Sequence, residues 1–245
     1  RVDIYAGIIF ACWADDAPTL EAYLGDARYY ADTTFNRTDN GTMVFGPMKW
    51  IEPCNWKSPV DNCSDNYHGP VSHFSATLVQ MRRGTTIRPE GIGHKGLFNS
   101  PNKHLFVNGH SLTFRLEEND EPRRTHGVTE NNIHIFREFH KATMPEAERR
   151  LGWTRAHKIQ MANHSFFPHG VLGFRLALPR GPLKTEFWHF VLVDKDAPDE
   201  VRRATIVGYG NNNGITGLME QDDQDNWIQM TQSGLSPKGR KIPSN

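Results

Sequence analysis

The sequence lacks three features, and each absence narrows the class of protein to which it can belong. Its 245 residues include only three cysteines, Cys12, Cys54 and Cys63, and none of them form a Cys-x-x-Cys pair. This argues against a disulfide framework or a cysteine-based zinc site and favours a reducing cytoplasm. No apolar run approaches the ~20 residues of a membrane helix. The first residues also lack the basic and apolar regions of a secretion signal.

The sequence also lacks net charge. Lys plus Arg number 28 and Asp plus Glu number 28, so the formal charge is zero. This balance gives no electrostatic reason to expect nucleic acid or an anionic membrane as a partner. There is no initiator Met, and residues 236–245 form a polar tail without a closing element. We therefore expect residues 1–245 to be one domain of a longer polypeptide, with an incomplete C-terminus.

Hydrophobic periodicity predicts a mixed domain. Alternating, β-branched segments predict strands over Ile4–Ala14 (a buried strand), Thr42–Glu52, His104–Leu116, Lys158–Phe167, Val171–Leu178 and Thr185–Val193. Spacing near 3.6 and capping residues predict helices over Leu20–Ala31, Asn62–Met81, Glu130–Arg149 (one helix broken near Pro145, or two), Asp199–Gly208 and Glu220–Met230. Gly and Pro predict a loop over Ile87–Asn99 and a turn over Pro179–Pro182. Strands joined by turns, with helices inserted, indicate an α+β domain whose helices cover one face of an antiparallel sheet.

The segment 61–73 has the densest chemistry in the chain. It contains Asp61, Asp65, His68 and His73 within thirteen residues. Two histidines and one carboxylate with open coordination positions form the facial triad of ferrous oxygenases. Since the chain has twelve histidines, the alternative is that this pair has no metal role.

The spacing of the two histidines sets a geometric condition. On a regular helix, five residues correspond to about 500°, so the side chains of His68 and His73 diverge by about 140°. They converge only if the helix is irregular, and we expect the break at Gly69-Pro70. His164 and His169 repeat the spacing, but in a predicted strand positions five apart face opposite sides. We interpret that second pair as structural.

A cluster of acids supplies candidates for the third ligand. Residues 220–227, Glu-Gln-Asp-Asp-Gln-Asp-Asn-Trp, adjoin apolar Ile215, Leu218 and Met219. Acids next to buried residues need a partner charge or a metal. The alternative is a solvated helix N-terminus, which also favours acids. Spacing alone does not choose among Asp222, Asp223 and Asp225.

These motifs resemble those of a known family. Asn55-Trp-Lys, Asp61-Asn62, Asp65-Asn-Tyr-His68 and His73 resemble the iron motif of Rieske non-haem iron ring-hydroxylating oxygenases. Residues 220–227 are similar to the family's third-ligand motif, and Phe167-Pro168, Arg180-Gly-Pro182 and 193–198 match stretches between the two motifs. The resemblance covers essentially the whole chain. It implies the catalytic domain of a large (α) subunit, with a helix-grip fold.

The resemblance also implies roles for individual residues. His68, His73 and Asp223 match the ligands of a mononuclear Fe(II). Asp65 matches the acid that bridges a metal-bound histidine to a histidine at a neighbouring subunit's Rieske cluster. Its place three residues before His68 suits a hydrogen bond that orients that ring. Asn62 resembles a pocket residue, although the loop here is one residue shorter than in many relatives. Further pocket candidates are Val71, Asn163, Leu172 and Met219, for which the alternative is ordinary core packing.

The resemblance implies partners as well. The family's Rieske domain needs a Cys-x-His and a Cys-x-x-His pair, and none of the three cysteines has that context. This chain therefore ligates no [2Fe-2S] cluster, and we expect the cluster in a domain preceding Arg1. The implied assembly is a trimer of α subunits, alone or with small β subunits. Electrons would come from NAD(P)H through a reductase and a ferredoxin.

The implied activity is cis-dihydroxylation of an aromatic hydrocarbon or aromatic acid by O2. A monooxygenase or demethylase of the same family shares the iron site, so motifs cannot separate the two reactions. A non-catalytic binder of hydrophobic ligands is the alternative from another class, and a hydrolytic zinc site is a weaker third. The Gly-rich segment 208–214 lacks the spacing of a nicotinamide-binding loop. No arginine stands out at the metal motif, but Arg82, Arg83 and Arg88 could fold toward it.

Overall fold

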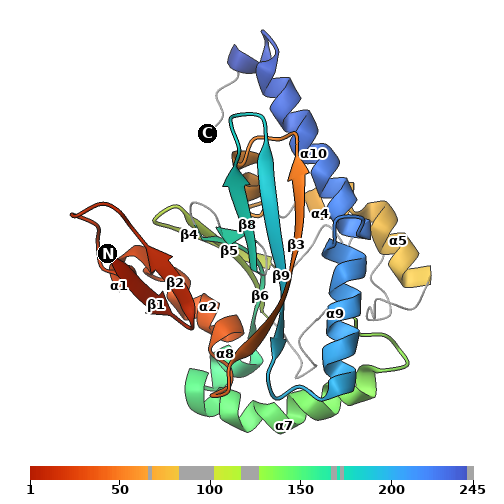
Figure 1. Cartoon of the computed structure of the whole chain (residues 1–245). Coiled ribbons are helices and arrows are strands. Elements are labelled where there is room, and N and C mark those ends of the chain that lie inside the picture. Colours follow the sequence, from red (N-terminus) through yellow and green to blue (C-terminus); the bar gives the residue numbers. More distant parts are fainter. Residues whose placement is uncertain (66–67, 83–101, 117–126, 167–169, 172–173, 242–245) are drawn as a thin grey trace.

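A seven-stranded sheet forms the centre of the protein (Figure 1). The structure, a computed structural model, describes all residues except 66–67, 83–101, 117–126, 167–169, 172–173 and 242–245. The strand order is β3-β9-β8-β7-β6-β5-β4, with each neighbouring pair antiparallel. The strands are β3 (Thr42–Glu52), β4 (Asn102–Val107), β5 (His110–Leu116), β6 (Ile159–Phe166), β7 (Gly170–Val171), β8 (Phe174–Pro179) and β9 (Thr185–Asp194). The predicted α+β class is confirmed.

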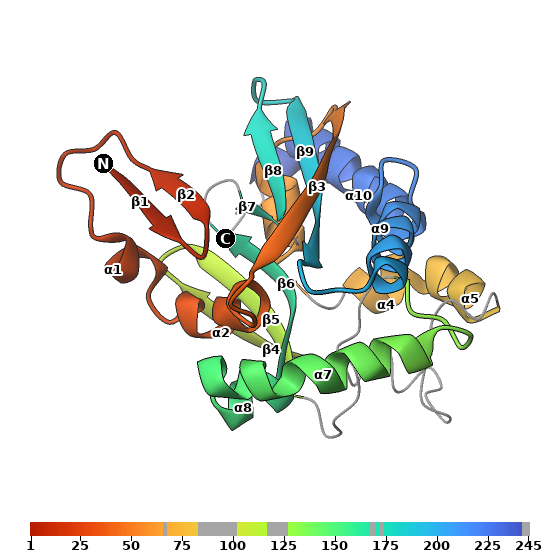
Figure 2. The ribbon, with the colours of Figure 1, turned by 60° about the horizontal axis from the view of Figure 1, so that its bottom comes forward.

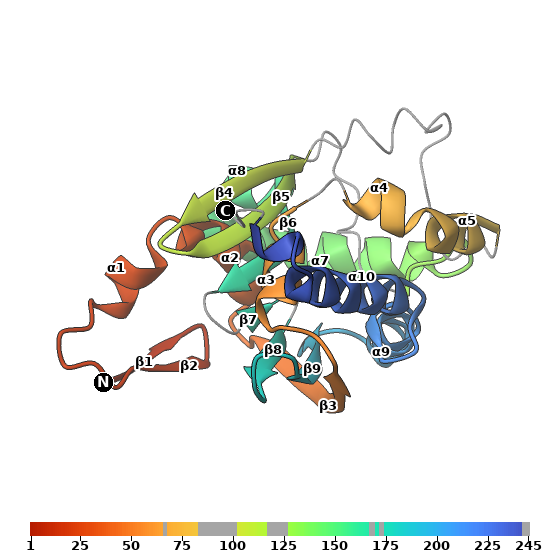
Figure 3. The same cartoon turned by 90° about the horizontal axis from the view of Figure 1, so that it is seen from above.

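Helices flank this sheet (Figures 1 and 2). Two long ones, α9 (Asp199–Asn213) and α10 (Leu218–Leu235), pack against each other, and α9 also packs on β9. Seen from above, α10 lies between α9 and α3 (Figure 3). The other helices are α1 (Leu20–Leu24), α2 (Ala27–Phe35), α3 (Lys57–Asn62), α4 (His68–Ser72), α5 (Phe74–Arg82), α7 (Ile133–Leu151), α8 (Trp153–His157) and the 3-10 turn η1 (Gly239–Lys241). None of the described helices is long and apolar enough to cross a membrane.

An aromatic cluster joins α10 to the sheet. The rings of Trp50 on β3 and Phe187 on β9 stack with centroids 5.2 Å apart, and Phe187 stacks on Trp227 of α10 at 5.3 Å. All three are buried, together with Cys54 and Cys63. Burying each large apolar side chain contributes about 1.5–3 kcal/mol. This cluster sets the distance between α10 and the sheet, and α10 carries the predicted third ligand.

The prediction of one buried strand over Ile4–Ala14 is wrong. That region is part of a hairpin of β1 (Val2–Tyr5) and β2 (Ile8–Ala11), joined at Ala6 and Gly7 with φ of +49° and +82°. Two adjacent positive φ angles form the two-residue turn that the twist of a hairpin favours. Ile4 and Ile9, side by side across the hairpin, are 63% and 69% exposed.

Glycines divide two further elements that the sequence predicts as continuous. The helix predicted over Leu20–Ala31 stops at Gly25, where φ is +48°, and α2 then begins a new helix. The strand predicted over His104–Leu116 turns back at Asn108-Gly109, with φ of +51° and +82°. Asn-Gly between alternating segments is a strong hairpin signal.

The remaining predictions differ mainly at their boundaries. The strand over Thr42–Glu52 is confirmed as β3, and the turn at Pro179–Pro182 joins β8 to β9. Pro145 does not divide its helix, since α7 continues through it. The strand predicted over Val171–Leu178 is represented by β7 and β8, and the Ile87–Asn99 loop lies outside the described residues.

Candidate metal centre

The two histidines of segment 61–73 lie at the ends of one short helix. His68 is the first residue of α4, and His73 occupies the junction between α4 and α5. The sequence predicts a break at Gly69-Pro70, and this prediction is wrong. The helix is instead interrupted at His73. The His73 amide still donates to the Gly69 carbonyl at 3.1 Å.

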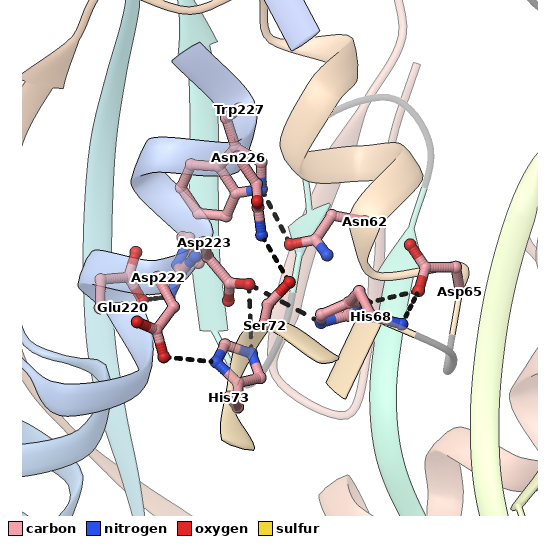
Figure 4. A network of polar contacts seen from close by, with 11 residues as sticks. Asn62, Asp65, His68, Ser72, His73, Glu220, Asp222, Asp223, Asn226 and Trp227 are labelled. Atoms are coloured by element: carbon pink, nitrogen blue, oxygen red, sulfur yellow. Dashed lines mark hydrogen bonds and ion pairs between the residues drawn. The ribbon is translucent and has the colours of Figure 1, made fainter. Parts of the chain in front are cut away.

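Asp223 faces both imidazoles from the second turn of α10 (Figure 4). Its Oδ1 lies 3.2 Å from His73 Nε2 and 3.7 Å from His68 Nε2. The two rings are 5.3 Å apart, centroid to centroid, and nearly perpendicular at 76°. The side chains of His68, His73 and Asp223 are 14%, 12% and 10% exposed, respectively. Two segments about 150 positions apart in the sequence thus meet in a nearly closed site.

The three side chains fit a divalent metal. One ligand atom from each lies within 4.8 Å of the others, so a single ion can contact all three. Asp223 Oδ1 is buried and has no hydrogen bond of regular geometry in the described part of the chain, although His73 Nε2 lies 3.2 Å from it. A buried carboxylate oxygen without a donor has a large desolvation penalty unless a cation approaches it. Two imidazoles and one carboxylate, with positions left open, are the donor set of mononuclear non-haem iron.

A carboxylate stands behind each imidazole (Figure 4). Asp65 Oδ1 lies 2.5 Å from His68 Nδ1, and Asp222 Oδ2 lies 3.2 Å from His73 Nδ1. Both pairings use Nδ1, which leaves each Nε2 facing Asp223. A hydrogen bond at one ring nitrogen fixes the tautomer and orientation of a metal-binding histidine and makes its other nitrogen a better donor.

The pKa shifts reflect these pairings. Burial opposes ionisation of Asp65, but hydrogen bonds from the side chain and backbone of His68, and one with Asn62, outweigh it and lower its pKa. Burial likewise opposes protonation of His73, yet Asp223 and Asp222 together raise its pKa above the usual range. Three carboxylates thus surround two imidazoles. The excess negative charge favours a dication at this position.

A groove with a volume of about 470 Å³ opens beside His68. Asn62 and Val71 both line it, as do Asp65 and His68. Asn62 is buried, and its Oδ1 accepts the Trp227 indole N–H at 2.8 Å, which ties α3 to α10. Val71 is 70% exposed, so ordinary core packing does not account for its position.

The other pocket candidates are not placed at this groove. Met219 is half-buried in the first turn of α10 and is not among the groove's lining residues. Asn163 pairs with Thr113 in the ladder between β6 and β5, but its side chain lies outside the described atoms. Leu172 falls outside the described residues, as does His169 of the second histidine pair.

Two features of the site were not assigned from the sequence. Asp222 was only one of three candidates for the ligand, and the structure gives it the separate position behind His73. Arg175 has no role predicted from the sequence, yet it forms a fully buried ion pair with Glu220. Of the three arginines that could fold toward the metal motif, Arg82 is exposed, and positions 83 and 88 lie outside the described residues. An arginine inside an otherwise apolar strand such as 174–178 was the available signal for Arg175.

The fold and donor set match one class of protein: mononuclear non-haem metal proteins built on an antiparallel sheet with covering helices. The chain belongs to the family described as ring hydroxylating alpha subunit (catalytic domain), whose model matches residues 20–243. It is 33% identical over 264 residues to biphenyl 2,3-dioxygenase subunit alpha of Rhodococcus jostii, covering 100% of this chain and 54% of that protein. It is also 33% identical over 271 residues to benzene 1,2-dioxygenase subunit alpha of Pseudomonas putida, covering 100% and 55%.

Solved structures share the fold of this chain. Naphthalene 1,2-dioxygenase with indole bound in its active site superimposes with a TM-score of 0.79 at 24% identity, covering 98% of this chain and 54% of that one. A Rhodococcus naphthalene 1,2-dioxygenase bound to indole gives 0.76 at 28% identity, covering 99% and 56%. The predicted family and helix-grip fold are confirmed. The chain spans about half the length of the relatives it matches.

Proposed function

We propose that residues 1–245 form the oxygen-activating catalytic domain of a ring-hydroxylating oxygenase α subunit, which cis-dihydroxylates an aromatic hydrocarbon. One observation carries the proposal: His68, His73 and Asp223 bring three ligand atoms within 4.8 Å of one another in a chain of this family. Relatives at 33% identity are named as biphenyl and benzene dioxygenase α subunits, which favours arenes of one or two rings.

The ligand set would hold one Fe(II) through the Nε2 atoms of His68 and His73 and the Asp223 carboxylate. When bound, this ion would supply a redox-active centre with open coordination positions for O2, while the electrons would come from the redox partners. Asp65 and Asp222 hold the Nδ1 proton of each imidazole, so that both Nε2 atoms remain available as donors. The low exposure of all three ligands keeps bulk water away from the site and strengthens the electrostatic attraction within it.

Asp65 has a second proposed role, in delivering electrons. It is on the groove side of His68, partly exposed with 22% of its side chain accessible, and it contacts the imidazole at 2.5 Å. A group placed between solvent and a metal ligand is suited to contact a docked redox centre. We propose that it receives a neighbouring subunit's Rieske domain in a trimer of α subunits, with or without β subunits. A reductase and a ferredoxin would supply electrons to the [2Fe-2S] cluster of that Rieske domain.

Iron content and product identity test this function together. The protein, supplied with its redox partners, should bind about one iron per chain and convert benzene or biphenyl to a cis-dihydrodiol carrying both atoms of labelled O2. One labelled atom in the product would instead indicate a monooxygenase of the same family. An iron-free protein that still binds arenes would indicate a ligand-binding domain, and activity that persists without O2 would indicate hydrolysis at zinc.

A further inference from the structure

A buried ion pair lies one helical turn from the proposed metal ligand. Arg175 of β8 donates from Nη2 to Glu220 Oε2, and the two side chains are 1% and 0% exposed. Glu220 precedes Asp223 by three residues on α10, which puts both on one face of the helix, about 4.5 Å apart along its axis. Because both side chains are closed off from solvent, the ion pair connects β8 to α10 without contacting water.

The surroundings hold Arg175 in a fixed direction. Its guanidinium lies 5.6–5.8 Å from the ring centroids of Trp50, Phe187 and Trp227. Nη2 also lies 3.3 Å from His189 Nδ1. Aromatic rings that surround a planar guanidinium leave it little rotational freedom. Arg175 therefore offers Glu220 a rigid anchor on the sheet.

The network continues to the next helix. His189 of β9 is fully buried, and its Nε2 lies 2.8 Å from the hydroxyl of Tyr209 on α9. Polar contacts thus run from α10 through β8 and β9 to α9. Asp223 lies between this network and a second tie, the hydrogen bond from Trp227 to Asn62 of α3. The first tie fixes the start of α10 on the sheet, and the second fixes α10 on the segment that leads to His68.

Net stability does not explain the pair. Removing two charges from water has a penalty that a buried ion pair seldom recovers, and apolar replacements of similar volume are often as stable or more so. A directional tie is what apolar packing does not provide. Arg175 and Asp223 also attract each other electrostatically, so Glu220, by holding Arg175, leaves the Asp223 carboxylate free for a cation.

We propose that the Glu220–Arg175 pair is the positioning device of the metal centre: it fixes Asp223 relative to the two histidines without contacting the ion. This inference rests on the proposed function, since it requires that Asp223 bind a metal. It adds two residues to those that set iron affinity and ligand geometry.

The test compares iron binding by wild type, Glu220→Gln and the double variant Arg175→Met/Glu220→Leu in the intact protein. Glu220→Gln keeps shape and an acceptor but removes the charge, whereas the double variant leaves no buried charge unpaired. We expect iron dissociation constants raised about 10–100-fold in both, the range for lost partners of metal ligands. The electron paramagnetic resonance spectrum of the nitric oxide adduct of the bound Fe(II) should also change in rhombicity. Should Glu220→Gln not fold, the double variant decides by the same readouts.

The matched control is Asp32→Asn, which changes a carboxylate to an amide in another ion pair. Asp32 lies 3.2 Å from Arg155, and the two side chains are 16% and 20% exposed. We expect a lower melting temperature with iron affinity and spectrum unchanged. Folded variants of the Glu220–Arg175 pair that bind iron as wild type does would overturn the positioning role. Failure of the wild type to bind iron would overturn the proposed function itself, which keeps the two failures distinct.

Discussion

The two imidazoles of the site are supported in different ways. Asp65, which pairs with His68, is three residues away in the same segment, and it also accepts the His68 backbone N–H at 3.0 Å. Asp222, which pairs with His73, comes from α10, 149 positions along the chain. The orientation of His68 is thus set locally, whereas that of His73 depends on the packing of α10. A perturbation of α10 should therefore affect His73 and Asp223 together and leave His68 in place.

The largest expected effect is the loss of a ligand. His73→Ala or Asp223→Ala should abolish stoichiometric iron binding and reduce turnover by at least about 10³-fold, because the remaining two donors do not hold the ion. Metal analysis and product formation measure this. His157→Ala is the control. His157 lies in α8, away from the proposed metal site, and its imidazole also contacts a carboxylate, that of Glu148, at 2.6 Å. Retention of full iron content and activity by either ligand variant would contradict the assignment.

Asp65→Asn and Asp222→Asn test the difference between the support of His68 and that of His73. Each should weaken iron binding by about 10–100-fold, since each removes the carboxylate that orients a metal-binding imidazole. With iron supplied in excess, Asp222→Asn should recover most of its turnover. Asp65→Asn should not, because Asp65 also has the proposed role in electron delivery. Equal recovery by the two variants in steady-state assays would remove that second role.

The pH dependence of iron binding should follow His73. Asp223 and Asp222 raise the folded-state pKa of His73, although burial opposes this. The protonated ring therefore stabilises the metal-free fold fully below the unfolded pKa of ~6.5. This stabilisation is lost as pH rises through the folded-state pKa. Iron needs the neutral ring, so apparent affinity should fall as pH drops through that same value, by up to about tenfold per unit. Titrations from about pH 8 to about pH 6 measure it. Asp222→Asn should move the transition to lower pH, and an unmoved transition would assign it to another group.

The smallest expected effect concerns the tie between α10 and α3. Trp227→Phe keeps the stacking on Phe187 but removes the hydrogen bond to Asn62, which leaves the buried Asn62 Oδ1 without that donor. Unfolding should become easier by about 1–3 kcal/mol, with iron affinity changed less than in Glu220→Gln. Chemical denaturation and iron titration together test this. A larger loss of iron than in Glu220→Gln would make the tie to α3 the more important of the two.

The sequence predicts the strongly periodic elements more reliably than the points at which the chain divides them. β3 and the turn between β8 and β9 follow from alternation and from Pro-Arg-Gly-Pro. The divisions at Gly7, Gly25 and Asn108-Gly109 were missed because the apolar pattern continues across each, while the backbone reverses or stops there. Local φ preferences decided those boundaries against the hydrophobic pattern.

The limits of sequence reasoning at the site have the same kind of cause. Motif position singled out Asp223, and spacing placed Asp65 next to His68. The pairing of Asp222 with His73 and of Arg175 with Glu220 spans 149 and 45 positions. Such pairings depend on how α10 packs against the sheet and on α4, which no local pattern encodes. The sequence predicts the break at Gly69-Pro70 because proline removes an amide donor, whereas α4 runs through both residues to Ser72.

We propose that His68, His73 and Asp223 bind one Fe(II). The most direct measurement is anaerobic titration of the metal-free protein with Fe(II), followed by nitric oxide and electron paramagnetic resonance. We expect about one iron per chain and a high-spin nitrosyl signal, which shows an exchangeable position on the ion, with both lost in Asp223→Ala. Iron binding of equal stoichiometry and the same signal in Asp223→Ala would contradict it.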